Sequence, residues 1–217
     1  MTSSWRKRVS DYSGAQLRIT YGLSEFCEGN AWECPACGFL HFPPTVYVEI
    51  DGFGTTGELI LSSLFPFSQV QLFLRYRTGD IFRRRDKCLM YDDWGYSFLG
   101  RKDFCPSVVG EAGEPAWISP LSVAEVLDTL DLGDHADHRD LHLKVQARNL
   151  TNRVFEISKL SESDAIVKVS GSATEEQRSL AKDELLRNLG VAAGALPRAD
   201  LHFDFVRRDE IANPFLY

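Results

Sequence analysis

The stretch Tyr76-Arg77-Thr78-Gly79-Asp80 decides how this sequence is interpreted. It follows an apolar run, Val70 to Leu74, that predicts a strand, and Thr78-Gly79 then favours a turn with Asp80 at the strand's end. A carboxylate held on a glycine turn is well placed to accept hydrogen bonds from two vicinal hydroxyls, such as those of a ribose. A plain strand-ending turn with a solvated aspartate fits the same residues, because Gly and Asp are ordinary turn residues.

The composition excludes several classes of protein. The chain has 217 residues, of which 44% are apolar, so it can form one large or two small domains with a packed core. Its formal net charge of -7 argues against a general affinity for nucleic acid or anionic membranes. No apolar run approaches the roughly 20 residues that span a bilayer.

The cysteines and the amino terminus indicate the compartment. Five cysteines are an odd count, which fits reduced thiols better than a disulfide framework. The basic residues Arg6 to Arg8 are not followed by the apolar segment of a secretory signal. We therefore expect a soluble cytoplasmic protein.

The first hundred residues have the pattern of an antiparallel sheet or small barrel. The segment from Trp5 to Leu17 predicts a short helix or a loop. Alternating β-branched and aromatic residues predict strands, at 17–20, 45–50, 57–61 and 94–99. Gly54-Thr55-Thr56-Gly57 superficially resembles a phosphate-binding loop, but it lacks a lysine and we expect a hairpin turn there.

The rest of the chain predicts a compact α+β unit. Ser119 and Pro120 favour a helix start, and Thr174-Glu175-Glu176-Gln177 is a capping box that opens a second helix, which Gly190 would close. Strands are expected at 141–145, 154–158, 166–170 and 201–205, and a loop at 106–115. We predict two domains of the α+β class, 1–100 and 101–217.

Three motifs fall in a fixed order: Tyr21-Gly22-Leu23-Ser24-Glu25, then residues 76–80, then Gly100-Arg101-Lys102-Asp103. Together with Gly57-Glu58-Leu59 and Ile118-Ser119-Pro120, this order resembles the adenylate-forming acid ligases, which include the acyl- and aryl-CoA synthetases. The likeness is greatest to the phenylacetate–CoA ligase branch. It extends from Ile19 to Phe205 and covers only the carboxyl-terminal half of a family member.

The resemblance implies a site for ATP and AMP. Its residues in this chain would be Tyr21, Gly22, Ser24, Glu25, Asp80, Arg101 and Asp103. Tyr21 and Gly22 would lie against the nucleotide, Asp80 would bind the ribose hydroxyls and Arg101 would support the same nucleotide. Ser24 would face phosphate oxygens and Glu25 would hold Mg²⁺, which prefers hard oxygen ligands. Asp103 matches the hinge about which a small lid domain, residues 101–217, swings against the end of the large domain, residues 1–100.

The sequence also departs from the family pattern. We find no Ser/Thr/Gly-rich phosphate loop that ends in lysine, and Arg207 to Pro214 lacks the Gly-Lys context of the adenylation lysine. Two hypotheses follow. One is a partial or split ligase that activates an aryl or acyl carboxylic acid for transfer to CoA or an amine, with a partner chain supplying the missing half. The other is a non-catalytic nucleotide- or acyl-binding accessory subunit that has lost adenylation. Either would leave an apolar face for a partner or for a second copy of the chain.

A metal site is the remaining prediction. Cys34-Pro35-Ala36-Cys37 has the spacing of a zinc knuckle, and His41 and Cys88 would complete four ligands, with Cys27 in reserve. The alternative is a pair of free thiols in a surface loop. Asp134 to His138 and Arg83-Arg84-Arg85 are each expected to be solvated.

Overall fold

The computed structural model describes residues 2–26, 30–67, 72–109, 115–134, 154–161, 164–188 and 201–211. It forms two compact units. One is Gln16–Asp103, which we call the sheet unit, and the other joins Met1–Ala15 to Phe104–Tyr217, which we call the mixed unit. The prediction put residues 1–100 in one domain, so it grouped residues 1–15 with the sheet unit, whereas the structure groups them with the mixed unit.

The first helix, α1 (Ser3–Ser13), belongs to the mixed unit because of polar contacts at its start. The Thr2 hydroxyl donates a hydrogen bond to Asp128 (2.5 Å), and the backbone amide of Ser3 donates to Glu125 (2.7 Å). Both acceptors lie on one helix, and the partners are more than a hundred positions apart in sequence. Such a pairing leaves no local signal in the sequence.

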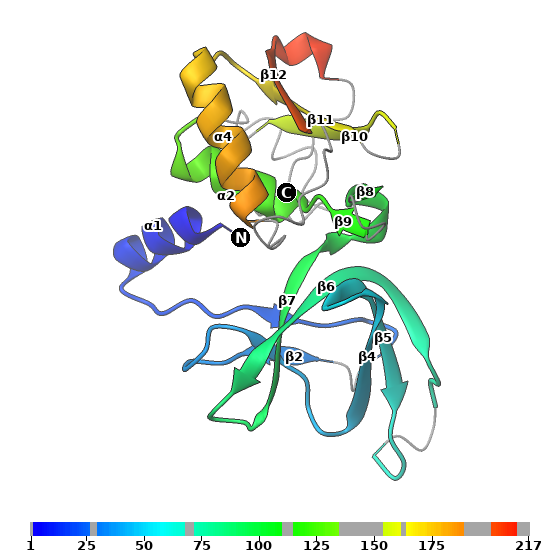
Figure 1. The fold of residues 1–217 in the computed structure, drawn as a ribbon. Helices are drawn as coiled ribbons and strands as arrows, with labels where there is room; N and C mark the ends of the chain where they lie inside the picture. Colours follow the sequence, from blue (N-terminus) through cyan, green and yellow to red (C-terminus); the bar gives the residue numbers. More distant parts are fainter. Residues whose placement is uncertain are drawn as a thin grey trace. The chain divides into compact units, whose positions relative to one another are not determined.

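The sheet unit is a curled antiparallel sheet of seven strands (Figure 1), and each adjacent pair is antiparallel. The spatial order is β1-β2-β3-β7-β6-β5-β4. The strands are β1 (Thr20–Tyr21), β2 (Ala31–Glu33), β3 (Leu40–His41), β4 (Val46–Phe53), β5 (Thr56–Ser63), β6 (Tyr76–Cys88) and β7 (Asp93–Arg101). The expected hairpin at residues 54–57 is confirmed, since β4 and β5 are joined by a turn in which Gly54 has φ of 62°.

The structure corrects the prediction around residues 70–80. Residues 72–75 form no strand and residues 68–71 lie outside the described ranges, whereas the stretch from Tyr76 opens the long strand β6. Arg77 pairs with Ile60 and Ile81 pairs with Glu58, so three residues of β6 face a single residue of β5. Asp80 is therefore carried by a β-bulge inside a strand and not by a turn after one.

The core of the sheet unit is aromatic. Phe82 is fully buried, and its ring lies 4.9 Å from the ring of Tyr21, 5.4 Å from that of Phe98 and 6.0 Å from that of Phe42, measured between ring centres. Edge-to-face and tilted pairs of this kind stabilise a core beyond the area they bury. Residues 83–85 lie within β6 and Arg83 is buried, so the expected solvated turn there is wrong.

The mixed unit packs two helices with a three-stranded sheet. The order is β10-β11-β12, with β10 antiparallel and β12 parallel to β11. The short helix η2 (Lys102–Phe104) includes the last two residues of the sheet unit and the first residue after the division. The further elements of the mixed unit are β8 (Ser107–Val109), β9 (Pro115–Trp117), α2 (Pro120–Thr129), β10 (Phe155–Lys159), β11 (Ala165–Ser170), α4 (Glu175–Asn188), β12 (Leu201–Val206) and η3 (Arg208–Glu210). The core of the mixed unit is mostly aliphatic, with Val126, Leu127, Val167 and Leu185 fully buried beside Phe155.

Both predicted helix starts are confirmed. The Ser119 hydroxyl accepts from the amide of Ser122 (3.3 Å) ahead of Pro120. Thr174 and Gln177 exchange two hydrogen bonds, from the Gln177 amide to the Thr174 hydroxyl and from the Thr174 amide to the Gln177 side chain. The loop expected at 106–115 instead contains the strands β8 and β9, and the expected strand at 141–145 and Gly190 lie outside the described residues. Within the described ranges, none of the helices combines the length and apolarity of a membrane span.

Candidate functional site

The sheet unit brings together Tyr21, Glu25, Tyr76, Asp80 and Arg101, which we call the carboxylate cluster. They come from β1, β6, β7 and the segment after β1. Tyr21 and Asp80 are 59 positions apart in sequence, and Arg101 lies opposite Asp80 because the two residues pair across β6 and β7. The curl of the sheet and this register therefore build the cluster.

Asp80 is the centre of this cluster. Its side chain is only 4% exposed, and each carboxylate oxygen accepts a hydrogen bond from a neighbouring side chain. The Tyr21 hydroxyl donates to Oδ2 (2.7 Å), and Arg101 donates to Oδ1 (3.2 Å) and also to the carbonyl oxygen of Thr78 (3.0 Å). Burial raises the pKa of Asp80 above its ordinary value, although the Tyr21 hydrogen bond and the Arg101 charge oppose that shift.

Tyr21 is held as a neutral phenol. Burial and the neighbouring Asp80 carboxylate raise the pKa of Tyr21, so its hydroxyl stays a hydrogen-bond donor over the physiological range. Its ring packs edge-on against Phe42 and Phe82, which fixes the direction of the hydroxyl. The phenol and the guanidinium therefore orient the Asp80 carboxylate from two sides.

Glu25 is an exposed carboxylate with two hydroxyl donors. The Tyr76 hydroxyl donates to Oε1 (2.6 Å) and the Ser24 hydroxyl donates to Oε2 (3.0 Å). The hydrogen bond from Tyr76 is the main reason that the pKa of Glu25 lies below its ordinary value, and the Arg101 charge adds to the shift. An ionised, exposed carboxylate is the kind of single protein ligand that Mg²⁺ accepts while it keeps waters or phosphate oxygens.

The other predicted site residues are placed as follows. Gly22 lies so close to Asn30 that a Cβ there would be 2.2 Å from the Asn30 side-chain oxygen. Asp103 is exposed on η2, two residues after Arg101, and makes no direct contact with the cluster among the described interactions. The structure thus brings Tyr21, Asp80 and Arg101 into direct contact and leaves Asp103 apart.

No role was assigned from the sequence to one member of the cluster, Tyr76, or to two further residues, Thr78 and Glu58. Tyr76 orients Glu25, although we gave it no role within its pentapeptide. Thr78 stabilises the bulge, because its hydroxyl donates to the carbonyl of Leu59 (2.9 Å) and accepts from the amide of Asp80 (3.1 Å). Glu58, nearly buried, accepts from Lys102 (2.9 Å) next to Asp103. For Tyr76 and Thr78, the only signal in the sequence was their position near Asp80.

Gly79 allows the bulge, and this leads to a prediction. It has φ of 72°, and a Cβ there would meet nothing nearer than Arg101 at 3.9 Å, so only the backbone conformation opposes a side chain. We expect Gly79→Val to lower the free energy of unfolding by about 1–2 kcal/mol, since valine is strained in the left-handed region. Urea denaturation of the wild type and the variant would measure this difference in the free energy of unfolding.

Gly79→Asn is the matched control, because asparagine tolerates positive φ. We expect it to cost less than half as much as the valine substitution. Equal losses for the two variants would contradict the backbone explanation and would point to a side-chain clash.

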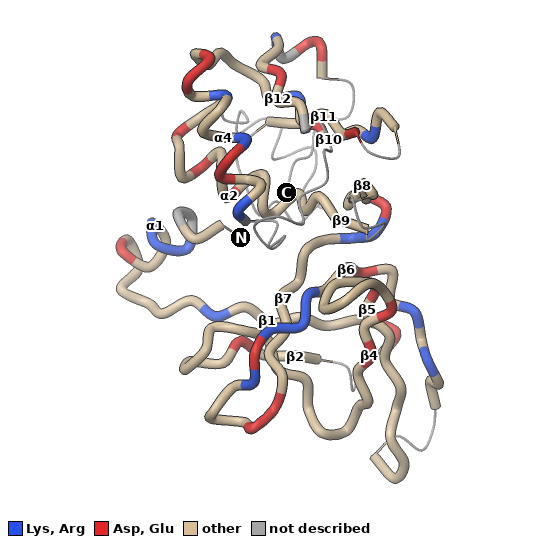
Figure 2. The backbone as a smooth tube through the Cα atoms, in the orientation of Figure 1, with Lys and Arg blue, Asp and Glu red and all other residues tan. Residues whose placement is uncertain are grey.

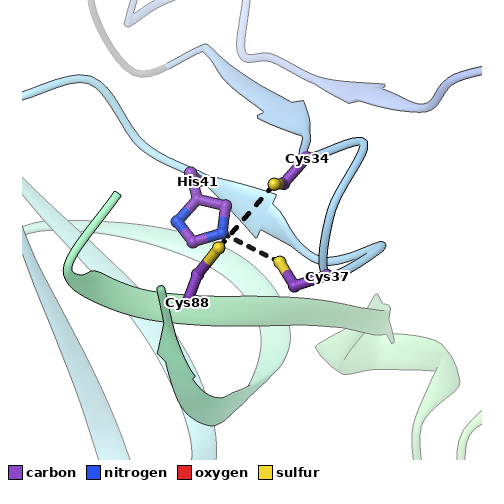
Figure 3. A group of neighbouring side chains, drawn as sticks. All are labelled: Cys34, Cys37, His41 and Cys88. Atoms are coloured by element: carbon purple, nitrogen blue, oxygen red, sulfur yellow. Dashed lines mark hydrogen bonds between the residues drawn. The ribbon is translucent and has the colours of Figure 1, made fainter. Parts of the chain in front are cut away.

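A second group of residues, Cys34, Cys37, His41 and Cys88, forms what we call the cysteine–histidine cluster (Figure 3). One potential ligand atom from each lies within 4.8 Å of the others. Cys34 follows β2, Cys37 lies in the next turn, His41 ends β3 and Cys88 ends β6. Cys27, the reserve ligand of the prediction, lies outside the described residues.

Contacts within this cluster join its members in pairs. The Cys34 and Cys88 sulfurs are 3.7 Å apart, and the Cys37 sulfur is 3.2 Å from Nε2 of His41. Burial by itself raises the pKa of Cys34, but hydrogen bonds from the amides of Cys37 and Ala36 and from the Cys88 thiol outweigh it and bring it below the ordinary value. Burial raises the pKa of Cys37 to about 11.

The remaining polar groups form no third site among the described residues. Asp134 accepts from the Ser170 hydroxyl (2.6 Å), a structural contact, and residues 135–138 lie outside the described ranges. Cys105 is buried in the mixed unit and has no part in the cysteine–histidine cluster. Figure 2 shows acidic and basic residues interspersed along the described parts of both units.

The fold of this chain is similar to that of known ligases, although its sequence is not. No protein-family model and no curated protein sequence matches the chain. Coronafacic acid ligase from Pectobacterium brasiliense is similar over 96% of this chain and 39% of its own, at 17% identity and a TM-score of 0.50. O-succinylbenzoate coenzyme A synthetase from Bacillus subtilis is similar over 93% of this chain and 41% of its own, at 15% identity and a TM-score of 0.49.

These ligases are longer proteins, and this chain spans about two fifths of their length. At such low identity the likeness concerns the fold, and the comparison with coronafacic acid ligase carries it. The predicted α+β class with an antiparallel sheet is confirmed. The chain has the fold of a segment of coronafacic acid ligase.

Proposed function

We propose that the sheet unit binds the nucleoside of ATP and of an acyl adenylate, as one part of a ligase of the phenylacetate–CoA ligase branch. The ligase would activate an aryl or acyl carboxylic acid as acyl-AMP and transfer it to CoA or an amine. The observation that carries the proposal is the orientation of a nearly buried carboxylate, Asp80, by Tyr21 and Arg101.

A ribose offers two adjacent hydroxyl donors, and a carboxylate has lone pairs for both in addition to its protein donors. Asp80 is held by one donor on each oxygen, so its remaining lone pairs keep a fixed direction. Because Arg101 is half exposed, its guanidinium can also meet negative charge on a nucleotide. Ring faces such as that of Tyr21 suit contact with an adenine.

Glu25 would hold the Mg²⁺ that accompanies ATP, with Ser24 beside the phosphate oxygens. The exposed, ionised carboxylate and its two hydroxyl donors fit that ion, which when bound neutralises charge on the phosphates. Gly22 lies in the same segment, where a Cβ would displace the side chain of Asn30. Tyr76 would fix the direction in which Glu25 presents its oxygens.

The mixed unit would be the mobile lid, and Asp103 its hinge. Asp103 is the last residue of the sheet unit, so a rotation of its backbone would redirect the chain that enters the mixed unit. The contact between Glu58 and Lys102 lies within the sheet unit and would anchor the residue that precedes this hinge. A protein partner would supply the phosphate loop and the adenylation lysine that these 217 residues lack.

Calorimetric titration of the chain with AMP tests this proposal. We expect saturable binding that ATP with Mg²⁺ displaces, and no ATP–pyrophosphate exchange by the chain alone. Exchange should appear when a protein carrying the Lys-ending phosphate loop is added. A folded chain that binds neither AMP nor ATP would overturn the proposal.

The second candidate is a non-catalytic accessory subunit that binds a nucleotide or an acyl group. The oriented Asp80 carboxylate would serve such binding without any catalytic step. Three results together would support this candidate. The chain would bind AMP, co-purification would recover no second subunit, and ATP–pyrophosphate exchange would be absent with and without a protein that carries the phosphate loop.

A further inference from the structure

We propose that Cys34, Cys37, His41 and Cys88 bind one zinc ion, which fastens the short strands β1 to β3 to the rest of the sheet unit. This inference is independent of nucleotide binding. It rests on the distances, burial and ligand types of the cysteine–histidine cluster (Figure 3).

Two distances between ligand atoms are close to those of a tetrahedron around a single ion, and all four ligand atoms lie within 4.8 Å of one another. With Zn–S bonds of about 2.3 Å and Zn–N bonds of about 2.0 Å, tetrahedral angles place two sulfurs about 3.8 Å apart and a sulfur and a nitrogen about 3.5 Å apart. The Cys34 and Cys88 sulfurs are 3.7 Å apart, and the Cys37 sulfur is 3.2 Å from His41 Nε2. A disulfide would require about 2.05 Å between sulfurs.

The backbone around the first two cysteines already has a metal-gripping shape. The amide of Ala36 donates to the Cys34 sulfur (3.3 Å), and the amide of Gly38 donates to the Cys34 carbonyl (2.9 Å). Gly38 has φ of 73°, which lets the turn close beneath the cysteines. Amide donors that point at a sulfur stabilise the thiolate, the form that binds a metal.

His41 presents one nitrogen to the cluster and buries the other. Its Nε2 faces the Cys37 sulfur, while Nδ1 is buried without a hydrogen-bond partner among the described residues. The ring stacks on Tyr91, with 4.7 Å between ring centres, so its orientation is fixed. A bond from Nε2 to a metal would offset the unfavourable burial of this imidazole.

The ligand set indicates zinc in a structural role. Three thiolates and an imidazole in tetrahedral positions are typical of zinc, and four protein ligands leave no open position for a substrate. Cys34, His41 and Cys88 are each at most 5% exposed, so water has little access to the ion from their side. A catalytic zinc would instead keep one position open.

The connection that the ion would make is otherwise weak. Strand β3 pairs with β7 through a single residue pair, Leu40 with Tyr96. Strands β1, β2 and β3 contain two, three and two residues, so their ladders contribute few hydrogen bonds. An ion shared by the turn before β3 and the end of β6 would join residues 54 positions apart and fix this edge of the sheet.

Metal analysis of the full chain, purified from zinc-supplemented medium without chelators, tests the proposal. We expect one zinc per chain, and cobalt in its place should give the strong visible absorption of a tetrahedral thiolate site. Cys37→Ser and Cys88→Ser should each retain almost no metal. Cys105→Ser is the matched control, a buried cysteine outside the cluster, and should retain one zinc.

Removal of the ion from the wild-type chain tests the structural role without a substitution. A strong chelator should lower the unfolding temperature, and zinc but not magnesium should restore it, because an ion that binds only the folded state stabilises it. Amides of residues 31–41 should exchange faster after chelation, while those of β11 should not. A wild-type chain that binds neither zinc nor cobalt would overturn the site, and unchanged exchange on removal of bound zinc would overturn its structural role.

Discussion

Asp80→Asn is expected to weaken AMP binding by about a hundredfold. Asparagine keeps the shape of the side chain but loses the charge and one of the two acceptor oxygens. Hydrogen bonds to a charged group contribute about 1.5–3 kcal/mol each. Loss of two from the ribose removes about 3 kcal/mol, and each 1.4 kcal/mol is about a tenfold change in the dissociation constant. Isothermal titration calorimetry would measure it.

Asp86→Asn is the control for this variant. Asp86 lies on the same strand and is exposed. Its substitution removes the same charge as Asp80→Asn, but away from the cluster. It should bind AMP as the wild type does. If Asp80→Asn binds AMP with unchanged affinity, then Asp80 does not contact the ribose and the proposed nucleotide site is wrong.

The pH dependence of nucleoside binding follows from the raised pKa of Asp80. As the pH falls through that pKa, the carboxylate gains a proton and loses its acceptor capacity, so affinity should decrease towards acid. Because burial raises the pKa, the decrease should begin at a higher pH than an ordinary aspartate would give. Adenosine is the probe, since it has no phosphate to titrate, and Asp80→Asn should lack this acid limb.

Phe82→Ala is expected to lower the free energy of unfolding of the sheet unit by about 3–5 kcal/mol, the usual range for truncating a buried aromatic residue. Phe82 is fully buried and contacts the rings of Tyr21, Phe42 and Phe98. The substitution removes these contacts and leaves a cavity under Tyr21. Hydrogen exchange at the amides of β5 to β7 would measure the loss within this unit.

Phe53→Ala is the matched control, since Phe53 ends β4 and is 59% exposed. It should change the free energy of unfolding by no more than about 0.5 kcal/mol. A loss below about 1 kcal/mol for Phe82→Ala would mean that the aromatic cluster is not the core of the sheet unit.

The sequence by itself determined the features that depend on neighbouring residues. The capping box at Thr174 to Gln177, the cap at Ser119 and the hairpin turn after Phe53 were all predicted, because each signal lies within a few residues of the structure it specifies. The alternation of apolar residues likewise predicted the β-rich first part and the α+β class. The Cys-x-x-Cys spacing indicated two members of the cysteine–histidine cluster on the same grounds, and His41 and Cys88 were predicted with them.

Only the tertiary structure decided what depends on register and on distant contacts. The bulge that carries Asp80 arises from the pairing of β6 with β5, and α1 belongs to the mixed unit through contacts with α2. The resemblance had placed Tyr21 and Asp80 in one site, and Cys88 was an expected ligand beside Cys34, but the contacts across 59 and 54 positions are made only by the folded sheet. Strand pairing and sheet curvature set such approaches, and no local pattern of side chains records which residues a folded sheet will bring face to face.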